Sequence, residues 1–89
     1  MPTIHVDPTP NPNSLKFTLE EGHFIESGME SFRSAEEAAS HPLASKLFAL
    51  PGVDNVFIMP QFLTVTKKPE ADWDNLLPRI QEILQEYIH

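Results

Sequence analysis

Four histidines are the residues of this sequence best suited to hold a metal ion: His5, His23, His41 and His89. Imidazole is the commonest metal-binding side chain, but two ligands on one element need a local spacing such as i, i+4. None of the four histidines has another at such a spacing, so they are read as scattered polar residues. Direct iron binding stays open as an alternative, in which His5 and His23 meet in the fold and acids complete a nitrogen and oxygen ligand set.

The sequence lacks the nucleophiles and loops of familiar enzymes. It has no cysteine, which removes disulfides, thiolate catalysis and cysteine-ligated iron–sulfur clusters. No serine lies in a glycine-flanked nucleophile elbow, and the three glycines are isolated, so there is no phosphate-binding loop. The acid pairs Glu20-Glu21 and Glu36-Glu37 lie at a turn and at a helix start, where carboxylates are stabilised without any catalytic role. We therefore predict that the protein is not an enzyme.

Protein recognition is the chemistry that the sequence supports best. Three prolines within five positions make a stiff loop from Asp7 to Ser14, whose asparagines offer amide groups either to a partner or to Asx-type turns. Lys16 follows on the polar face of a strand, and aromatic residues in excess of the core would form an apolar contact patch. Each candidate also has a purely structural interpretation, as a turn former, a solvated charge or a core residue. The candidate partner-binding residues are Asn11, Asn13, Ser14, Lys16, Phe48 and Phe62.

Alternating apolar residues predict the strands that position these candidates. The clearest strand runs from Leu15 to Leu19, and a shorter one includes Ile4 and Val6. Two apolar runs around Pro60-Gln61 predict a β-hairpin from Val53 to Thr66. Between Phe24 and Phe32 we expect irregular or short β pieces.

A capping box marks the start of the first helical region. We expect the Ser34 hydroxyl to accept from the Glu37 N–H, and the Glu37 side chain to accept from the Ser34 N–H. Pro42 interrupts the apolar spacing that follows, so we predict a kink or two short helices that meet near Ser40 to Pro42.

The C-terminal segment predicts a strongly amphipathic helix. Its apolar residues recur at three- and four-residue spacing from Trp73 to Ile88. Asp72 or Asp74 is the expected cap. Pro78 is expected to follow an irregular first turn, with the regular helix beginning just before it.

The predicted elements assemble into one α+β domain over residues 1–89, with the order ββαββα. We expect a two-layer sandwich in which an antiparallel sheet of about four strands has two helices on one face. The large residues expected between the layers are Phe17, Phe57, Trp73, Leu77, Ile80 and Leu84.

The net charge of the protein disfavours some classes of binding partner and favours others. A formal charge of −7 opposes binding to nucleic acid and to anionic membranes, and favours a basic patch on a protein partner. There is no apolar run of about 18 residues that would span a membrane. The segment Met1 to Asp7 has neither a basic stretch nor an apolar h-region, so a cytoplasmic location is expected.

Several separated segments resemble the N-terminal domain of Nfu/NifU-type iron–sulfur scaffold proteins. They are T-P-N-P-N-S-L-K-F over 9–17, P-L-A over 42–44, L-F-A-L-P-G-V over 47–53, F-L-T-V-T-K over 62–67 and the stretch 73–78. They occur in the family's order and together extend over almost the whole chain. The resemblance implies the family's fold and a context of iron–sulfur cluster assembly.

The resemblance also implies what this chain does not carry. In that family the domain normally precedes a second one, whose C-x-x-C pair holds a bridging iron–sulfur cluster between two subunits for delivery to client proteins. Since the present sequence has no cysteine, we expect it to bind no cofactor, with iron or a cluster entering only through the family context. Small stand-alone members are the nearest match, and the implied partner is an iron–sulfur scaffold, carrier or client protein. An unrelated small-ligand or regulatory role is a third alternative.

Overall fold

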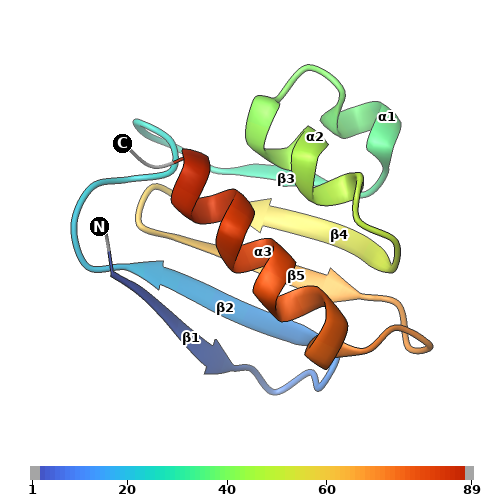
Figure 1. Ribbon diagram of the computed structural model, residues 1–89. Helices are drawn as coiled ribbons and strands as arrows, with labels where there is room; N and C mark the ends of the chain where they lie inside the picture. Colours follow the sequence, from blue (N-terminus) through green and yellow to red (C-terminus); the bar gives the residue numbers. More distant parts are fainter. Residues whose placement is uncertain (1–2, 88–89) are drawn as a thin grey trace.

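A computed structural model describes residues 3–87 and confirms the α+β class (Figure 1). Five antiparallel strands form one sheet in the order β1-β2-β5-β4-β3. The strands are β1 (Ile4–Pro8), β2 (Ser14–Leu19), β3 (Glu30–Phe32), β4 (Val53–Ile58) and β5 (Phe62–Lys67). The helices are α1 (Ala35–Ala38), α2 (Pro42–Phe48) and α3 (Trp73–Tyr87).

The sheet has one strand more than the four expected. The additional strand, β3, has three residues and pairs antiparallel with β4 at one edge of the sheet. Glu30 and Ser31 are exposed and Phe32 is half-buried. β3 therefore lacks the alternation of apolar and polar residues that predicted the other strands. The predicted hairpin is confirmed, because β4 and β5 pair directly across a short turn.

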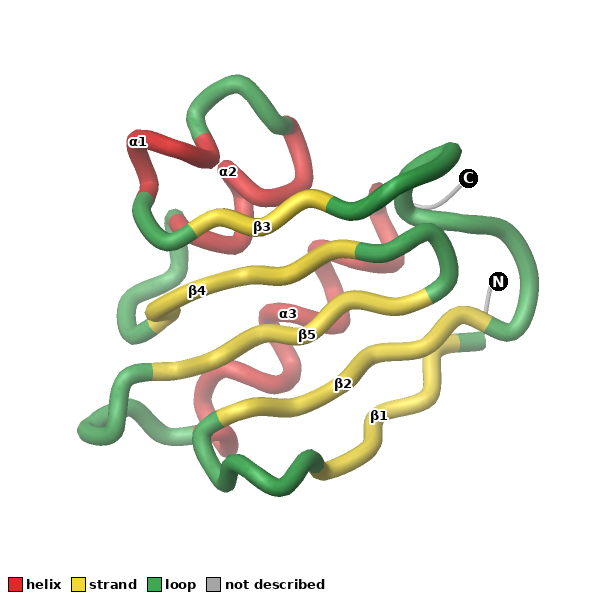
Figure 2. Tube along the Cα trace, turned by 180° about the vertical axis from the view of Figure 1, so that it is seen from behind, coloured by secondary structure: helices red, strands yellow, loops and turns green. Residues whose placement is uncertain are grey.

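The helices cover one face of the sheet and leave the other uncovered. Figure 2 shows the sheet from behind, with α3 on its far side and none of α1 to α3 in front of the strands. Strand residues that point toward the helices alternate with residues on the uncovered face, as the period of a strand requires. The largest fully buried side chains are Phe17, Leu43, Leu47, Ile58, Leu63, Ile80, Leu84, Val56 and Val65.

The region of the capping box folds as two short helices, as predicted. Ser34 caps α1, and its hydroxyl accepts from the Glu37 N–H at 3.2 Å. The reciprocal bond differs from the prediction, because the Glu37 carboxylate accepts from the Arg33 N–H at 2.8 Å instead of that of Ser34. Pro42 begins α2, where its missing N–H costs no helical hydrogen bond.

At the start of the last helix, Asp72 is confirmed as one of the two expected caps, but the prediction of an irregular first turn before Pro78 was wrong. Helix α3 begins at Trp73, and Pro78 lies inside it. Asp72 accepts from the Asp74 N–H at 3.0 Å through its carboxylate and thereby stabilises the first turn. Pro78 removes the donor that would meet the Asp74 carbonyl, but both residues are exposed, so the lost bond is on the side of α3 that faces solvent.

Candidate functional site

The loop before β2 is closed by hydrogen bonds among its own residues. The Asn11 side-chain oxygen accepts from the Asn13 N–H at 2.9 Å, which is an Asx-type turn. The Ser14 N–H donates to the Asn11 carbonyl at 2.9 Å, and the Thr9 hydroxyl accepts from the Asn11 N–H at 3.2 Å. These contacts give Asn11 a structural role in shaping the loop.

A buried lysine connects this loop to β5, 54 residues further along the chain. Lys67, at the end of β5, is 8% exposed, and its Nζ donates to the Asn13 side-chain oxygen at 3.0 Å. The Lys67 N–H also donates to the Asn13 carbonyl at 2.8 Å. Trp73, at the start of α3, donates its indole N–H to the Pro12 carbonyl at 3.3 Å. Asn13 is thus engaged in holding the loop against β5.

Lys67 is a site residue that the sequence analysis missed, although a signal for it exists. It follows Leu63 and Val65 with the period of two that places side chains on the helix-covered face. A charged residue in that position is expected to be buried with hydrogen-bonding partners. Ser14 is buried as well, and its hydroxyl lies 2.6 Å from that of Thr66.

Lys16 and Phe62 come together on the uncovered face of the sheet. The Lys16 Nζ lies 4.4 Å from the centroid of the Phe62 ring, within the range of a cation–π contact. Phe57 lies beside them, with 6.4 Å between the centroids of its ring and that of Phe62. These three half-buried residues, Lys16, Phe57 and Phe62, form what we call the aromatic patch.

The position of Phe57 corrects the predicted core. Its neighbours Val56 and Ile58 are buried among the helices, so alternation along β4 turns Phe57 to the uncovered face. Trp73 and Leu77, also expected in the core, are half-buried and pack against its edge.

The two aromatic candidates Phe48 and Phe62 do not form one patch. Phe48 ends α2 in the helical layer, where it packs partly buried against the core. Phe62 is on the other side of the sheet. A single partner surface on the uncovered face therefore includes Lys16 and Phe62 and leaves Phe48 out.

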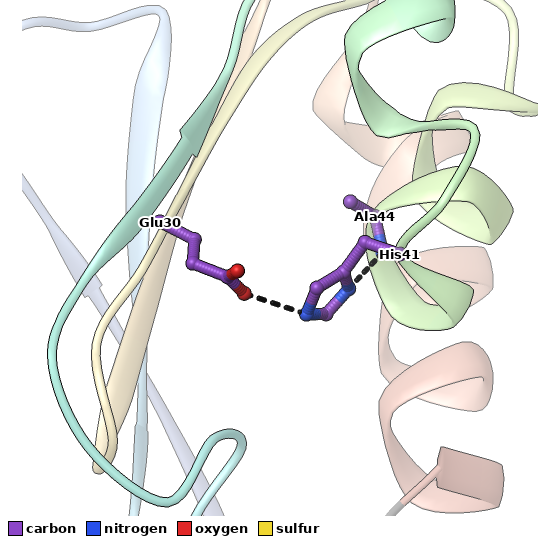
Figure 3. A network of polar contacts seen from close by, with 3 residues as sticks. All are labelled: Glu30, His41 and Ala44. Carbon is purple, nitrogen blue, oxygen red and sulfur yellow. Dashed lines mark hydrogen bonds and ion pairs between the residues drawn. The ribbon is translucent and has the colours of Figure 1, made fainter.

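The histidines are engaged separately. His5 Nε2 lies 3.3 Å from a carboxylate oxygen of Glu20. His41 caps α2: its Nδ1 accepts from the Ala44 N–H at 3.2 Å, and its Nε2 lies 2.9 Å from Glu30 (Figure 3). His23 is exposed.

No metal-binding cluster is assembled within residues 3–87, where no three His, Cys, Asp or Glu side chains are grouped to hold an ion. His89 lies outside the described residues. Among those same residues no helix is long and apolar enough to cross a membrane.

Comparison with known proteins extends over almost the whole chain. The family model described as scaffold protein Nfu/NifU N terminal matches residues 4–89. The human NFU1 iron-sulfur cluster scaffold homolog, mitochondrial, is 40% identical over 85 residues, which cover 94% of this chain and 33% of that protein. NifU-like protein 5, mitochondrial, from Arabidopsis thaliana is 38% identical over 84 residues, which cover 94% of this chain and 30% of that protein.

A solved structure has the same fold. The solution structure of a NifU-like protein from Saccharomyces cerevisiae superposes with a TM-score of 0.84 at 27% identity. The match covers 96% of this chain and 76% of that one. The present chain spans about a third of the length of the curated relatives named above.

Proposed function

The chain belongs to the Nfu/NifU N-terminal family, and on that premise we propose that it is a non-enzymatic binding module of iron–sulfur cluster assembly. In this role it holds a scaffold, carrier or client protein, while the cluster itself is cargo on the partner. The observation that carries the proposal is the match of the family model from residue 4 to residue 89. A cytoplasmic location stays a prediction, since the named relatives are mitochondrial.

The uncovered face of the sheet supports recognition as the activity. Aromatic side chains that are half-buried in the free protein supply contact area at low cost in conformational entropy. Phe62 meets this description, and Lys16 already lies over its ring in the aromatic patch. Asn11, Asn13 and Ser14 contribute by fixing the loop that leads into β2, and Phe48 would serve a separate contact on the helical layer.

Direct iron binding by His5 and His23 is the alternative. His5 already lies beside the Glu20 carboxylate, a nitrogen and oxygen pair of the kind that iron accepts. Two ligands make an incomplete site, so this alternative requires His23 or another acid to move toward His5.

An NMR titration of the labelled protein tests both functions. Ferrous iron is added first under anaerobic conditions, followed by purified cysteine-bearing scaffold proteins from the same cell. We expect no response to iron, and shifts at Lys16, Phe57 and Phe62 with a scaffold protein. Broadening at His5 and His23 with iron alone would instead establish a metal-binding protein and overturn the proposal.

A matched pair of charge reversals then tests the contact surface. Lys16→Glu alters the uncovered face, whereas Lys46→Glu makes the same charge change at an exposed position in α2. We expect Lys16→Glu alone to weaken scaffold binding, because it removes the cation–π contact with Phe62. An equal change in affinity with both variants would assign the effect to net charge and remove the uncovered face from the proposal.

A further inference from the structure

A cleft of about 450 Å³ lies at the turn between β4 and β5. We call it the turn cleft. Its size falls within the range of about 300 to 1,000 Å³ typical of ligand-binding clefts. The turn and the loop between β2 and β3 lie at the same end of the sheet (Figure 1). The lining residues are His23, Glu26, Met59, Pro60, Gln61 and Phe62.

Hydrogen bonds from distant segments fix the backbone of the turn cleft. The Phe24 N–H donates to the Pro60 carbonyl at 2.7 Å, and Phe24 is itself buried in the core. The Leu19 N–H, at the end of β2, donates to the Gln61 carbonyl at 2.8 Å. The turn and the loop are thus held together before any ligand arrives. A preformed cleft loses little conformational entropy on binding, which favours affinity.

The turn cleft offers an apolar surface to one inserted side chain. Met59, Pro60 and Phe62 are each half-buried, so part of each still contacts water. Methionine is unbranched and polarisable and adapts to differently shaped partners. Phe62 also belongs to the aromatic patch, so the turn cleft is continuous with the uncovered face of the sheet.

One carboxylate, Glu26, lines the turn cleft, and the loop that supplies it is acidic. The loop between β2 and β3 contains histidine but no Lys or Arg, and the two acids at its ends lie beside histidines. Within residues 3–87 no ion pair forms at Glu21 or Glu26, both of which are exposed. The four carboxylates of this segment are Glu20, Glu21, Glu26 and Glu30.

Charge complementarity indicates which kind of molecule would bind in the turn cleft. Opposite potentials steer association, and like charges brought together at an interface are unfavourable. A second copy of this chain, with its formal charge of −7, would place acid against acid. A basic segment would meet the Glu26 carboxylate, which forms no ion pair within residues 3–87, beside an apolar surface.

We propose that the turn cleft is the docking site for a basic segment of the partner protein. The segment inserts one apolar side chain against Met59 and Phe62 and places Lys or Arg beside Glu26. The inference rests on the proposed function, because it names the chemistry by which that function selects its partner.

Three synthetic peptides test this docking mode on the full-length protein. The first, Lys-Arg-Phe-Leu-Arg-Lys, combines basic and apolar residues; the second replaces Phe-Leu by Gly-Gly; the third replaces every basic residue by Glu. We expect only the first to shift the amide signals of His23, Glu26, Met59 and Phe62. Equal binding of the first two peptides, binding of the acidic peptide, or shifts confined to other residues would each overturn the proposal.

Charge reversal at Glu26 provides the matched control. Glu26→Lys should raise the Kd of the first peptide by about fivefold or more, because an attraction becomes a repulsion. Glu36→Lys makes the same change at an exposed position in α1, away from the turn cleft, and should change the Kd by less than about twofold. Equal effects of the two variants would reduce the binding to net charge and refute the site.

Competition separates this inference from the proposed function. Suppose that the peptide binds in the turn cleft, and that iron–sulfur scaffold, carrier and client proteins neither displace it nor bind anywhere else on the protein. The docking chemistry then stands and the proposed function fails. If such a protein binds and the peptide remains in place, the proposed function stands and the turn cleft is not its docking site. Displacement that is lost in Glu26→Lys supports both.

Discussion

The bond between Asn13 and Lys67 leads to a quantitative prediction of stability. The Lys67 ammonium is almost wholly buried, and its contacts within residues 3–87 are the Asn13 amide oxygen at 3.0 Å and the Lys68 carbonyl at 3.5 Å. Asn13→Ala removes the shorter contact and leaves a buried charge poorly satisfied. Hydrogen bonds to charged groups contribute about 1.5 to 3 kcal/mol. We expect the free energy of unfolding to fall by that amount, and Tm to fall by at least about 6 °C for a domain of this size.

A double-mutant cycle identifies the physical cause. Lys67→Met keeps much of the aliphatic stem and removes the charge, so Asn13→Ala should cost less than about 1 kcal/mol in that background. Urea unfolding followed by the fluorescence of Trp73 and by circular dichroism gives the four stabilities. Trp73 contacts the loop directly, so agreement between the two probes also checks that unfolding is two-state. Additive effects of the two substitutions would refute the assignment of the stability to this bond.

Other substitutions test the fold and the aromatic patch. Gly52→Ala places a Cβ 2.6 Å from that of Ala71 at a φ of +99°, so urea unfolding should show a loss of about 1 to 3 kcal/mol, and an unchanged stability would contradict the close approach. His41→Ala removes the cap of α2 and should cost about 1 kcal/mol in thermal unfolding. His41→Asn supplies another capping side chain and should recover most of this loss, and equal losses would exclude capping as the cause. Phe57→Ala should weaken binding of a scaffold protein by about tenfold in calorimetry while unfolding remains cooperative, and unchanged affinity would exclude Phe57 from the interface.

The elements with strong periodicity could be predicted from the sequence. Leu15, Phe17 and Leu19 alternate and form the strand β2, which lies in the interior of the sheet. The interruption at Pro42 was also informative, because a proline after a short helical segment favours the start of a new helix, where its missing N–H costs no bond. Lys16 and Phe62 were separate candidates in the sequence, and pairing of β2 with β5 brings them into contact.

The remaining features depend on tertiary contacts. β3 lies in the region where irregular or short β pieces were expected, but its three residues lack the alternation that would define its bounds, which are set by pairing with β4. Pro78 is tolerated within α3 because the bond it removes lies on the exposed side, a fact that depends on how the helix packs. The spacing of Lys67 after Leu63 and Val65 indicates the helix-covered face, but its partner Asn13 comes from a loop 54 residues earlier in the chain, which the sequence does not reveal.

The pairing of β2 with β5 has a consequence for the order of folding. Ser14 and Thr66, whose hydroxyls touch across this pair, are 52 positions apart in the chain, whereas the β1–β2 and β4–β5 hairpins close locally. Closing a long loop costs chain entropy before any contact compensates for it. We therefore expect the pairing of β2 with β5 to form later in folding than the two hairpins that it joins.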